Sequence, residues 1–480
     1  MNGEEFKRNG HALVEWIAEY LEHPERYPVL AQVAPGDVRA GLPASAPESG
    51  QRFEEIFPDV ERVLVPALTH WNHPGFFAYF AISSSPVAVL AEFLAAALNQ
   101  QAMLWRTSPA ATELEEVSLA WLRQLLGLPA DFEGVIYDTA SVSTLHGLAA
   151  AREARVPGVR QHGLAARSDV SPLRIYCSEH AHSSVDKAVI LLGFGHDSLR
   201  RIPCNDAFEM RVDLLEAAID RDLADGAVPV AVIATIGTTS TTSSDPVDAI
   251  ATVCAARGVW LHVDAAYAGV AAMLPGHRRH FAGWERADSI VVNPHKWLFV
   301  PVDLSAFYCR RMDVVRRAFS LVPDYLKTPD EERGARNLMD TGIQLGRRFR
   351  ALKLWMVLRE FGAAGIRDVL SRHIELARRF AAWVDDHPDF ERTAPCPFSV
   401  VCFRARPAGL GDDQLDALNE RILEAVNASG QVFLSHTRLN GVFVLRLAVG
   451  HLRTTEEHVA RAWQLLQQAL GHASAGILSR

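Results

Sequence analysis

Residues 228–236 read VPVAVIATI, and residues 245–263 read DPVDAIATVCAARGVWLHV. The first run is apolar and β-branched, which is typical of a strand buried on both faces of a parallel sheet. The second begins with Asp-Pro, which suits an N-cap and a first helical position, and Gly258 suits a helix end. It therefore predicts a helix over 247–257 and a strand over 259–263. This strand–helix–strand order indicates an α/β architecture with a mostly parallel sheet.

The same reading extends to both sides of this stretch. Further short strands are expected at 174–177 and 289–292, and the basic, apolar segment 346–361 predicts a helix. Helical periodicity at the N-terminus predicts two helices joined by a connector rich in Pro, Gly, Ala and Ser. From about residue 371 the pattern changes to that of a small α+β domain. The N-terminal helices are expected at 6–21 and 53–68 with the connector at 35–50, and the C-terminal elements at 398–403 (strand), 412–428 (helix) and 442–447 (strand), before a terminal helix.

Composition excludes several classes of protein. With 480 residues the chain is too long for one ordinary core, and 49% hydrophobic with 22% charged residues is typical of a globular protein. A net charge of −9 argues against nucleic acid as a partner. The six cysteines form no CxxC pair, the N-terminus lacks an apolar signal core, and no apolar run reaches the ~20 residues that span a bilayer. We expect a cytoplasmic protein without a membrane partner and without a metal site.

Two charged residues stand just after predicted strands. Lys296 lies in NPHKW (293–297), and Asp264 ends the strand that begins at Val259. Taken alone, Lys296 reads as a surface lysine and Asp264 as a helix cap. Taken together at the carboxyl edge of one sheet, they match pyridoxal phosphate, which needs a lysine for its aldehyde and an acid for its pyridine nitrogen.

Three further segments fit the same cofactor. The hydroxyl-rich run DTASVST (138–144) precedes a helical stretch at 145–155, so its N–H groups form a candidate phosphate site. The run GTTS (237–240) adds hydroxyls after another strand. His182, after the strand at 174–177, is a candidate for stacking on the ring. An ordinary N-cap, a polar loop and a structural histidine remain the alternatives for these three features.

With these residues identified, the chain resembles the group II pyridoxal-phosphate decarboxylases, and among them the aromatic L-amino-acid decarboxylases. The resemblance covers nearly the whole chain. Each motif alone is weak, but the five together are specific. They are HVDAAYAG (262–269), NPHKW (293–297), AHSSVDK (181–187), SPAATEL (108–114) and LGRRFRALK (345–353).

The resemblance implies roles for individual residues. Lys296 is similar to the Schiff-base lysine, Asp264 to the partner of the pyridine nitrogen, His182 to the residue stacked over the ring, and Ala266 to the residue beneath it. Tyr325 matches a tyrosine that protonates the α-carbon after carbon dioxide leaves. Relatives that oxidise the amine to an aldehyde carry phenylalanine there, so Tyr325 favours simple decarboxylation. Positions that match the cofactor's surroundings are Ala140, Ser141, Thr239, Asn293 and His295.

The substrate pocket departs from the family pattern. A threonine that can bind a ring hydroxyl is replaced by Ile82, and Asp138 stands where a glycine usually precedes the phosphate turn. Gly346 matches a position where glycine leaves room for a large ring, which favours aromatic substrates over small or polar ones. The implied substrate-binding residues are Trp71, Tyr79, Phe80, Ile82, Gln101, Met103 and Gly346.

The implied fold is pyridoxal-phosphate fold type I, the aspartate-aminotransferase type, with a large seven-stranded α/β domain. We expect a dimerising segment at 1–85, a cofactor-binding domain at 86–370 and a small α+β domain at 371–480. The implied assembly is a homodimer with active sites at its interface. The predicted reaction is decarboxylation of an L-amino acid, aromatic in preference, to an amine. Aldehyde synthesis, another carbon–carbon lyase reaction, and a catalytically silent cofactor-binding protein are the alternatives.

Overall fold

The computed structural model describes residues 1–165, 167–321, 330 and 333–478. The chain divides into two compact units. The smaller unit combines Met1–Ala81 with Leu376–Thr393 and Val401–Arg480, so it is built from both ends of the chain. The larger unit contains Ile82–Glu375 and Ala394–Val400.

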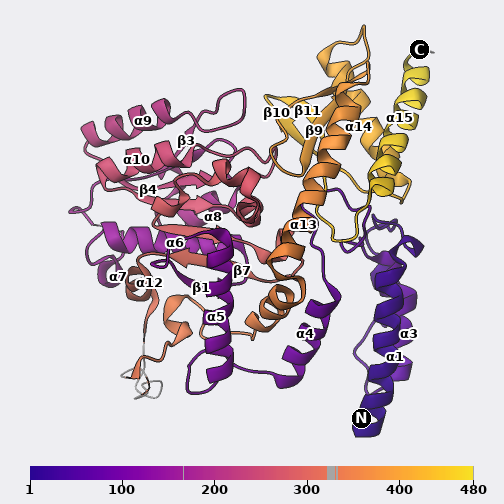
Figure 1. Cartoon of the computed structure of the whole chain (residues 1–480), viewed down its shortest axis with the longest axis horizontal. Coiled ribbons are helices and arrows are strands. Elements are labelled where there is room, and N and C mark those ends of the chain that lie inside the picture. Colours follow the sequence, from indigo (N-terminus) through magenta and orange to yellow (C-terminus); the bar gives the residue numbers. More distant parts are fainter. Residues whose placement is uncertain (166, 322–329, 331–332, 479–480) are drawn as a thin grey trace. The chain divides into compact units, whose positions relative to one another are not determined.

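A seven-stranded sheet forms the centre of the larger unit (Figure 1). Its strand order is β1-β7-β6-β5-β4-β2-β3, and only β7 runs antiparallel to its neighbours β1 and β6. This confirms the predicted fold class. The strands are β1 Glu133–Tyr137, β2 Leu173–Ser178, β3 Leu199–Ile202, β4 Val228–Thr235, β5 Trp260–Asp264, β6 Ser289–Val292 and β7 Ser305–Cys309.

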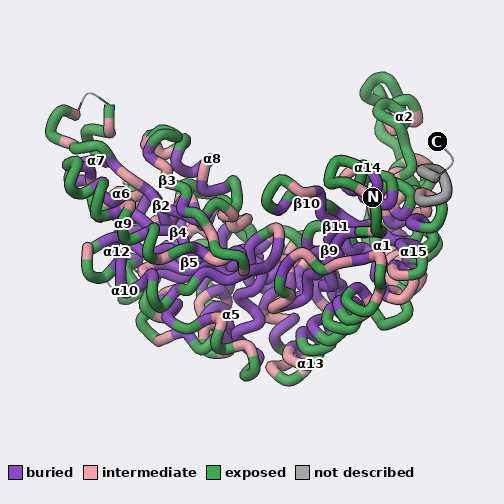
Figure 2. Tube along the Cα trace, turned by 90° about the horizontal axis from the view of Figure 1, so that it is seen from above, coloured by how far each residue is buried: buried purple, intermediate pink, exposed green. Residues whose placement is uncertain are grey.

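Helices cover both faces of this sheet. One layer contains α6 and α8, which pack together, and the other contains α9 and α10, which pack on β4. The strands between them form a continuous buried band (Figure 2), as expected of a parallel sheet covered on both faces. The helices are α4 Pro86–Leu98, α5 Pro109–Leu126, α6 Ala140–Arg155, α7 Val159–His162, α8 Ser184–Leu191, α9 Val212–Ala224, α10 Val247–Arg257, α11 Pro294–Trp297 and α12 Met312–Phe319.

Strands β4, β5 and β6 end side by side. Thr235 is the register partner of Asp264, and Asp264 is the partner of Val291. The loops that follow these strands therefore meet at one edge of the sheet. Gly237 makes this approach possible, because it has φ +86° and a Cβ there would lie 2.5 Å from the Cβ of Ala268.

The smaller unit contains a four-stranded sheet of order β10-β11-β9-β8. Helices α14 and α15 pack against each other, and α14 also packs on β11. The bounds are β8 Phe390–Arg392, β9 Val400–Ala405, β10 Ser435–Leu439, β11 Val442–Ala448, α1 Gly3–Glu22, α2 Asp37–Ala40, α3 Phe53–Asp59, α14 Asp412–Ala428 and α15 Glu456–Leu478. Helix α13, Ala351–Asp385, begins in the larger unit and ends in the smaller one.

Several predicted boundaries were wrong. The helix expected over 346–361 begins only at Ala351, because the backbone of Arg347 bonds instead to Gln101 Oε1 (2.6 Å) and to the Ala102 N–H (2.9 Å). It then continues to Asp385 across a break at Gly362.

The other differences concern helix starts. The helix expected from residue 145 begins at Ala140, so most of the hydroxyl-rich turn is already helical. The connector at 35–50 contains the single-turn helix α2. Asp245 does not cap α10, because its carboxylate accepts the N–H groups of Thr235 and Met210, each at 2.8 Å. Across the described residues, no helix has the length and hydropathy needed to cross a bilayer.

Candidate active site

Three of the predicted site residues meet at the carboxyl edge of the large sheet. Asp264 ends β5, Lys296 lies in α11 directly after β6, and His182 follows β2. The three side chains are close enough for their charges to interact. The charge of Asp264 raises the pKa of His182 and that of Lys296, and the charge of Lys296 lowers the pKa of His182. The parallel sheet thus brings together residues that are 82 and 32 positions apart in sequence.

The ε-amine of Lys296 is the candidate nucleophile. Its side chain is half-buried, and desolvation lowers its pKa, while the negative charge of Asp264 acts in the opposite direction. The effect of burial on the pKa is larger than that of Asp264, so a larger share of the amine is neutral at physiological pH than for an exposed lysine. A neutral amine is the form that attacks a carbonyl carbon.

Asp264 is held by the backbone that follows it. Its side chain is buried, and Oδ1 accepts the backbone N–H of Ala266 at 3.0 Å. His262 lies two residues earlier and therefore on the same face of β5, with Nδ1 2.8 Å from Ser289 Oγ. Burial lowers the pKa of His262 to about 4, so it is a neutral ring near Asp264. Sequence reasoning did not single out His262, although its two-residue spacing from Asp264 pointed to it.

The ring of His182 is oriented by the first residue of α8. Nδ1 accepts the backbone N–H of Ser184 at 3.1 Å and lies 2.9 Å from its hydroxyl. The proton of the neutral imidazole therefore resides on Nε2. Burial lowers the pKa of His182, which favours this neutral form.

Asn293 and His295 flank the start of α11. The N–H of Leu304 donates to Nδ1 of His295 at 2.9 Å, and the Nδ2 atom of Asn293 lies 3.3 Å from its Nε2. Burial lowers the pKa of His295 to about 4. Asn293 Oδ1 is buried and has no hydrogen-bond partner among the described residues, so it is available to a bound group.

The predicted anion site is the start of α6. Thr139 occupies the N-cap of this 16-residue helix, and its side chain forms no capping hydrogen bond with the first N–H groups. Ala140 and Ser141 open the helix, and Ser141 is exposed. Thr239 is exposed in the turn after β4. An uncapped helix start with adjacent hydroxyls is suited to phosphate.

Asp138 lies immediately before this anion site, and its charge is neutralised. One carboxylate oxygen pairs with Nη2 of Arg350 at 2.5 Å, and the other accepts from Gln344 at 2.8 Å. The buried Arg350 guanidinium also bonds Asp303 at 2.9 Å. Asp138 therefore does not face the anion site as a lone negative charge. This role of Arg350 was not predicted, although the residue lies in the quoted motif at 345–353.

The predicted substrate residues fall into two groups, one in each unit. In the smaller unit Trp71 stacks on Tyr79 with ring centroids 5.7 Å apart, and Arg446 lies over the ring of the buried Phe80. In the larger unit Gln101 contacts the segment that carries Gly346, since a Cβ there would lie 3.2 Å from Gln101 Nε2.

Three further predicted residues complete the set. Met103 packs on the cluster of Leu104 and Met339. Ile82 is half-buried at the start of the larger unit. Tyr325 lies outside the described residues.

The buried histidines of the larger unit predict acid sensitivity. The pKa values of His146, His262 and His295 are each lowered to about 4 by burial, so protonation favours the unfolded chain, where the pKa is near 6.5. The stability that they contribute is complete above pH 6.5 and is lost as the pH falls towards 4. Between pH 7 and pH 5 the free energy of unfolding should fall by about 2 kcal/mol per histidine.

Urea unfolding at the two pH values checks this expectation. His262→Gln should flatten the pH dependence, whereas replacement of the exposed His11 should leave it unchanged. Equal pH dependence in the wild type and His262→Gln would contradict the assignment of His262 as a buried neutral group.

The arrangement fits pyridoxal phosphate. A lysine with a lowered pKa, a buried carboxylate and an uncapped helix start correspond to the aldehyde, the pyridine nitrogen and the phosphate of that cofactor. The buried Asn293 Oδ1 without a partner among the described residues is a further polar group for it.

Comparison with known proteins also indicates a pyridoxal-phosphate enzyme. Residues 35–406 match the model of the pyridoxal-dependent decarboxylase conserved domain. The chain is 39% identical to tyrosine decarboxylase 4 of Petroselinum crispum, across 98% of this chain and 94% of that protein. It is 38% identical to phenylacetaldehyde synthase of Arabidopsis thaliana, across 98% and 96%. A crystal structure of Oryza sativa TDC with PLP and tryptamine superposes with a TM-score of 0.94 at 36% identity, covering 98% of this chain and 99% of that one. The chain belongs to the pyridoxal-dependent decarboxylase family and is a carboxy-lyase that uses pyridoxal phosphate.

Proposed function

We propose that this protein decarboxylates aromatic L-amino acids to the corresponding amines and carbon dioxide. The observation that carries the proposal is the meeting of Lys296, Asp264 and His182 at one sheet edge. The relatives support the aromatic preference, since one is named a tyrosine decarboxylase and a solved neighbour holds tryptamine.

Each residue of this site has a separate task. When bound, pyridoxal phosphate supplies an electron sink for the pair released at the substrate α-carbon. Lys296 provides the amine that holds the cofactor, and its lowered pKa keeps that amine reactive. Asp264 keeps a proton on the pyridine nitrogen through its buried negative charge. His182 and Ala266 would hold the ring from its two sides and so fix its orientation towards the substrate.

The phosphate is assigned to the start of α6. Ala140 and Ser141 offer N–H groups there, and Thr239, Asn293 and His295 complete the polar surroundings. Arg350 neutralises Asp138, which removes the repulsion that an unpaired carboxylate would exert on a phosphate.

The substrate side chain is assigned to residues of both units. In the smaller unit Trp71, Tyr79 and Phe80 offer flat apolar surface, and in the larger unit Ile82 and Met103 offer aliphatic surface. Gly346 leaves space beside Gln101 that a larger residue would fill. A pocket with little water favours the loss of a carboxylate charge as neutral carbon dioxide.

A panel of amino acids tests the substrate class. We expect release of carbon dioxide and amine from phenylalanine, tyrosine, tryptophan or their hydroxylated forms at rates at least tenfold above those for glutamate and leucine. Carbon dioxide detection combined with chromatography of the amine measures both products. A preference for glutamate would overturn the aromatic assignment, and no turnover on any amino acid would favour a silent cofactor-binding protein.

Tyr325 is assigned to protonation of the α-carbon after carbon dioxide has left. Replacement of Tyr325 by Phe removes the hydroxyl proton, so we expect the main product to change from amine to aldehyde, with dioxygen and water consumed and carbon dioxide, ammonia and hydrogen peroxide released. The aldehyde-synthase relative makes this branch chemically accessible to the family. Assays for peroxide and aldehyde, with Tyr267→Phe as the matched control, measure the change. An unaltered amine yield would refute the assignment.

We further propose that the protein is a cytoplasmic homodimer with active sites at the subunit interface. Helix α4 supports this, because Leu90, Phe93, Leu94 and Leu98 leave an exposed apolar stripe along it. No disulfide joins the six cysteines, all of which are described, as suits a reducing compartment. In this proposal residues 1–85 form the dimerising segment, 86–370 the cofactor-binding domain and 371–480 the small domain.

A further inference from the structure

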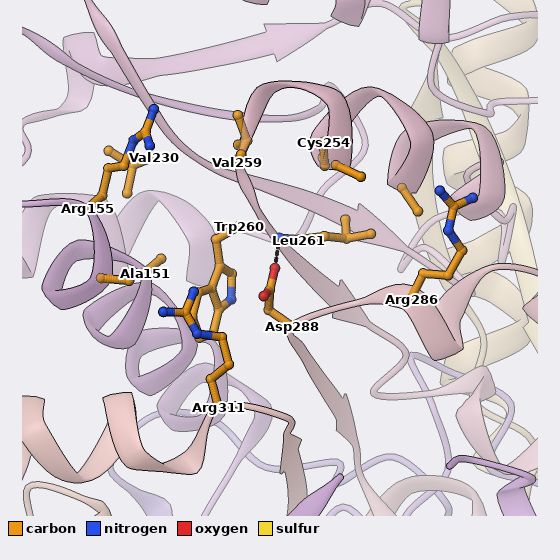
Figure 3. A pocket seen from close by; sticks show the side chains of 14 residues that line it. Ala151, Arg155, Val230, Cys254, Val259, Trp260, Leu261, Arg286, Asp288 and Arg311 are labelled. Carbon is orange, nitrogen blue, oxygen red and sulfur yellow. Dashed lines mark hydrogen bonds between the residues drawn. The ribbon is translucent and has the colours of Figure 1, made fainter. Parts of the chain in front are cut away.

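Arg347 and Glu115 form a buried ion pair in the larger unit. Nη2 of Arg347 lies 2.8 Å from Oε1 of Glu115, and only 6% and 3% of the two side chains are exposed. Among the described residues of this unit, Arg350 is the only other buried arginine. The arginines that line a cavity at the amino ends of β4 and β5 (Figure 3) are instead exposed: Arg155, Arg286 and Arg311. A buried ion pair adds little net stability, because both charges lose their water, so its further hydrogen bonds indicate its purpose.

The pair covers the free edge of β1. This strand is the first of the sheet, and β7 pairs with one side of it only. Oε1 of Glu115 accepts the N–H of Ile136 at 2.8 Å, and Nη2 of Arg347 donates to the Ile136 carbonyl at 2.8 Å. The two side chains therefore take the place of a neighbouring strand and satisfy backbone groups that are buried at an edge.

Arg347 also ties the segment that carries Gly346 to the segment that carries Gln101. Nη1 of Arg347 donates to the Ala102 carbonyl at 3.3 Å, and the Arg347 N–H donates to Oε1 of Gln101 at 2.6 Å. The carbonyl of Arg347 accepts the Ala102 N–H at 2.9 Å. The side chain and the backbone of one residue thus hold the two segments against each other, and the side chain holds both against β1.

The two segments depend on this cross-link more than the phosphate site does. Strand β1, which leads to the start of α6, keeps five register pairs with β7. Gln101 and Gly346 lie outside helices and strands and have no such ladder. The space between them is small, because a Cβ at Gly346 would lie 3.2 Å from Nε2 of Gln101. A small shift of either segment therefore changes the room beside Gly346.

We propose that Arg347, held by Glu115, is a positioning residue that sets the size of the substrate side-chain site by fixing Gly346 against Gln101. This inference rests on the proposed function, since it takes Gly346 and Gln101 as part of that site. It gives a purpose to a buried charge that lies far along the chain from the residues assigned to the cofactor.

Arg347→Lys tests the proposal, because a single ammonium group cannot reproduce the planar fork that reaches one carboxylate and two carbonyl groups. In the holoenzyme of this variant we expect the KM for the amino acid that the wild type decarboxylates fastest to rise about tenfold or more, with kcat and cofactor content nearly unchanged. The dissociation constant of the corresponding amine, measured by titration calorimetry, should rise in parallel.

The matched control is Arg348→Lys. Arg348 is the next residue of the same segment, but it is 60% exposed and pairs with Glu92 at 3.0 Å. Exposed pairs contribute little, so we expect the KM of the wild type. An unchanged KM in Arg347→Lys would overturn the proposal, as would a loss of kcat or cofactor at constant KM. If Arg347→Lys does not fold, the Arg347→Met, Glu115→Leu double variant removes both buried charges together and takes the same measurements.

A double-mutant cycle with Gly346→Ala separates positioning from a general loss of structure. The added Cβ fills the space beside Gln101 only while that space is fixed, so Gly346→Ala should raise KM more in the wild type than in Arg347→Lys. Independent, multiplicative effects on KM would overturn the proposal. A wild type that prefers glutamate to aromatic amino acids would overturn the proposed function instead, and the same cycle would then be measured with glutamate.

Discussion

Replacing Lys296 by alanine is expected to lower the decarboxylation rate by about four to six orders of magnitude. The ε-amine of Lys296 would hold the cofactor through its aldehyde, and its lowered pKa keeps a larger share of that amine neutral and nucleophilic. Without it, exchange between enzyme and substrate amines is lost. Carbon dioxide release measures the rate, and visible absorbance with dialysis measures cofactor retention.

The matched control is Lys187→Ala. Lys187 is exposed on α8, and its charge also acts on His182, yet it has no assigned role at the cofactor. We expect nearly normal turnover from this variant. Turnover by Lys296→Ala within tenfold of the wild-type rate would contradict the assignment of Lys296 as the residue that holds the cofactor.

Replacing Asp264 by asparagine should lower turnover by about two to three orders of magnitude, the cost of removing one preorganised electrostatic group. The amide can still accept the N–H of Ala266, so the fold at the end of β5 should be preserved. It carries no charge, however, and cannot keep the pyridine nitrogen protonated. The reaction then loses its electron sink although the cofactor remains bound.

Steady-state kinetics and the absorbance of the bound cofactor distinguish these effects. We expect a fall in kcat with retained cofactor and a midpoint of thermal unfolding close to that of the wild type. A variant that loses cofactor and stability together would indicate that Asp264 acts mainly in folding. Full activity in the asparagine variant would contradict its assigned role.

The elements predicted best from the sequence were those with local signals at both ends. Helix α10 has its predicted bounds because Gly258 adopts φ +63° at its C-cap, and α14 matches the predicted range 412–428. Strand β6 at 289–292 was also predicted correctly, because a short apolar run between turn residues has few alternatives.

The errors arose where distant groups compete for the backbone. The segment at 346–350 has helical periodicity, but Gln101 and Ala102 take its backbone hydrogen bonds. Asp245 has the form of an N-cap, but the N–H groups of Thr235 and Met210 occupy its carboxylate. No local pattern reports partners more than a hundred residues away, as in the first case.

The sequence by itself determined the fold class and the family and predicted which lysine, acid and histidine form the site, because strand and helix periodicity and short motifs are local properties of the chain. Only the tertiary structure decided how charges are compensated. Arg350 reaches Asp138 across more than two hundred residues, and Arg347 reaches Glu115 across a similar separation. Electrostatic and hydrogen-bond energies depend on separation in space, which the order of residues does not specify.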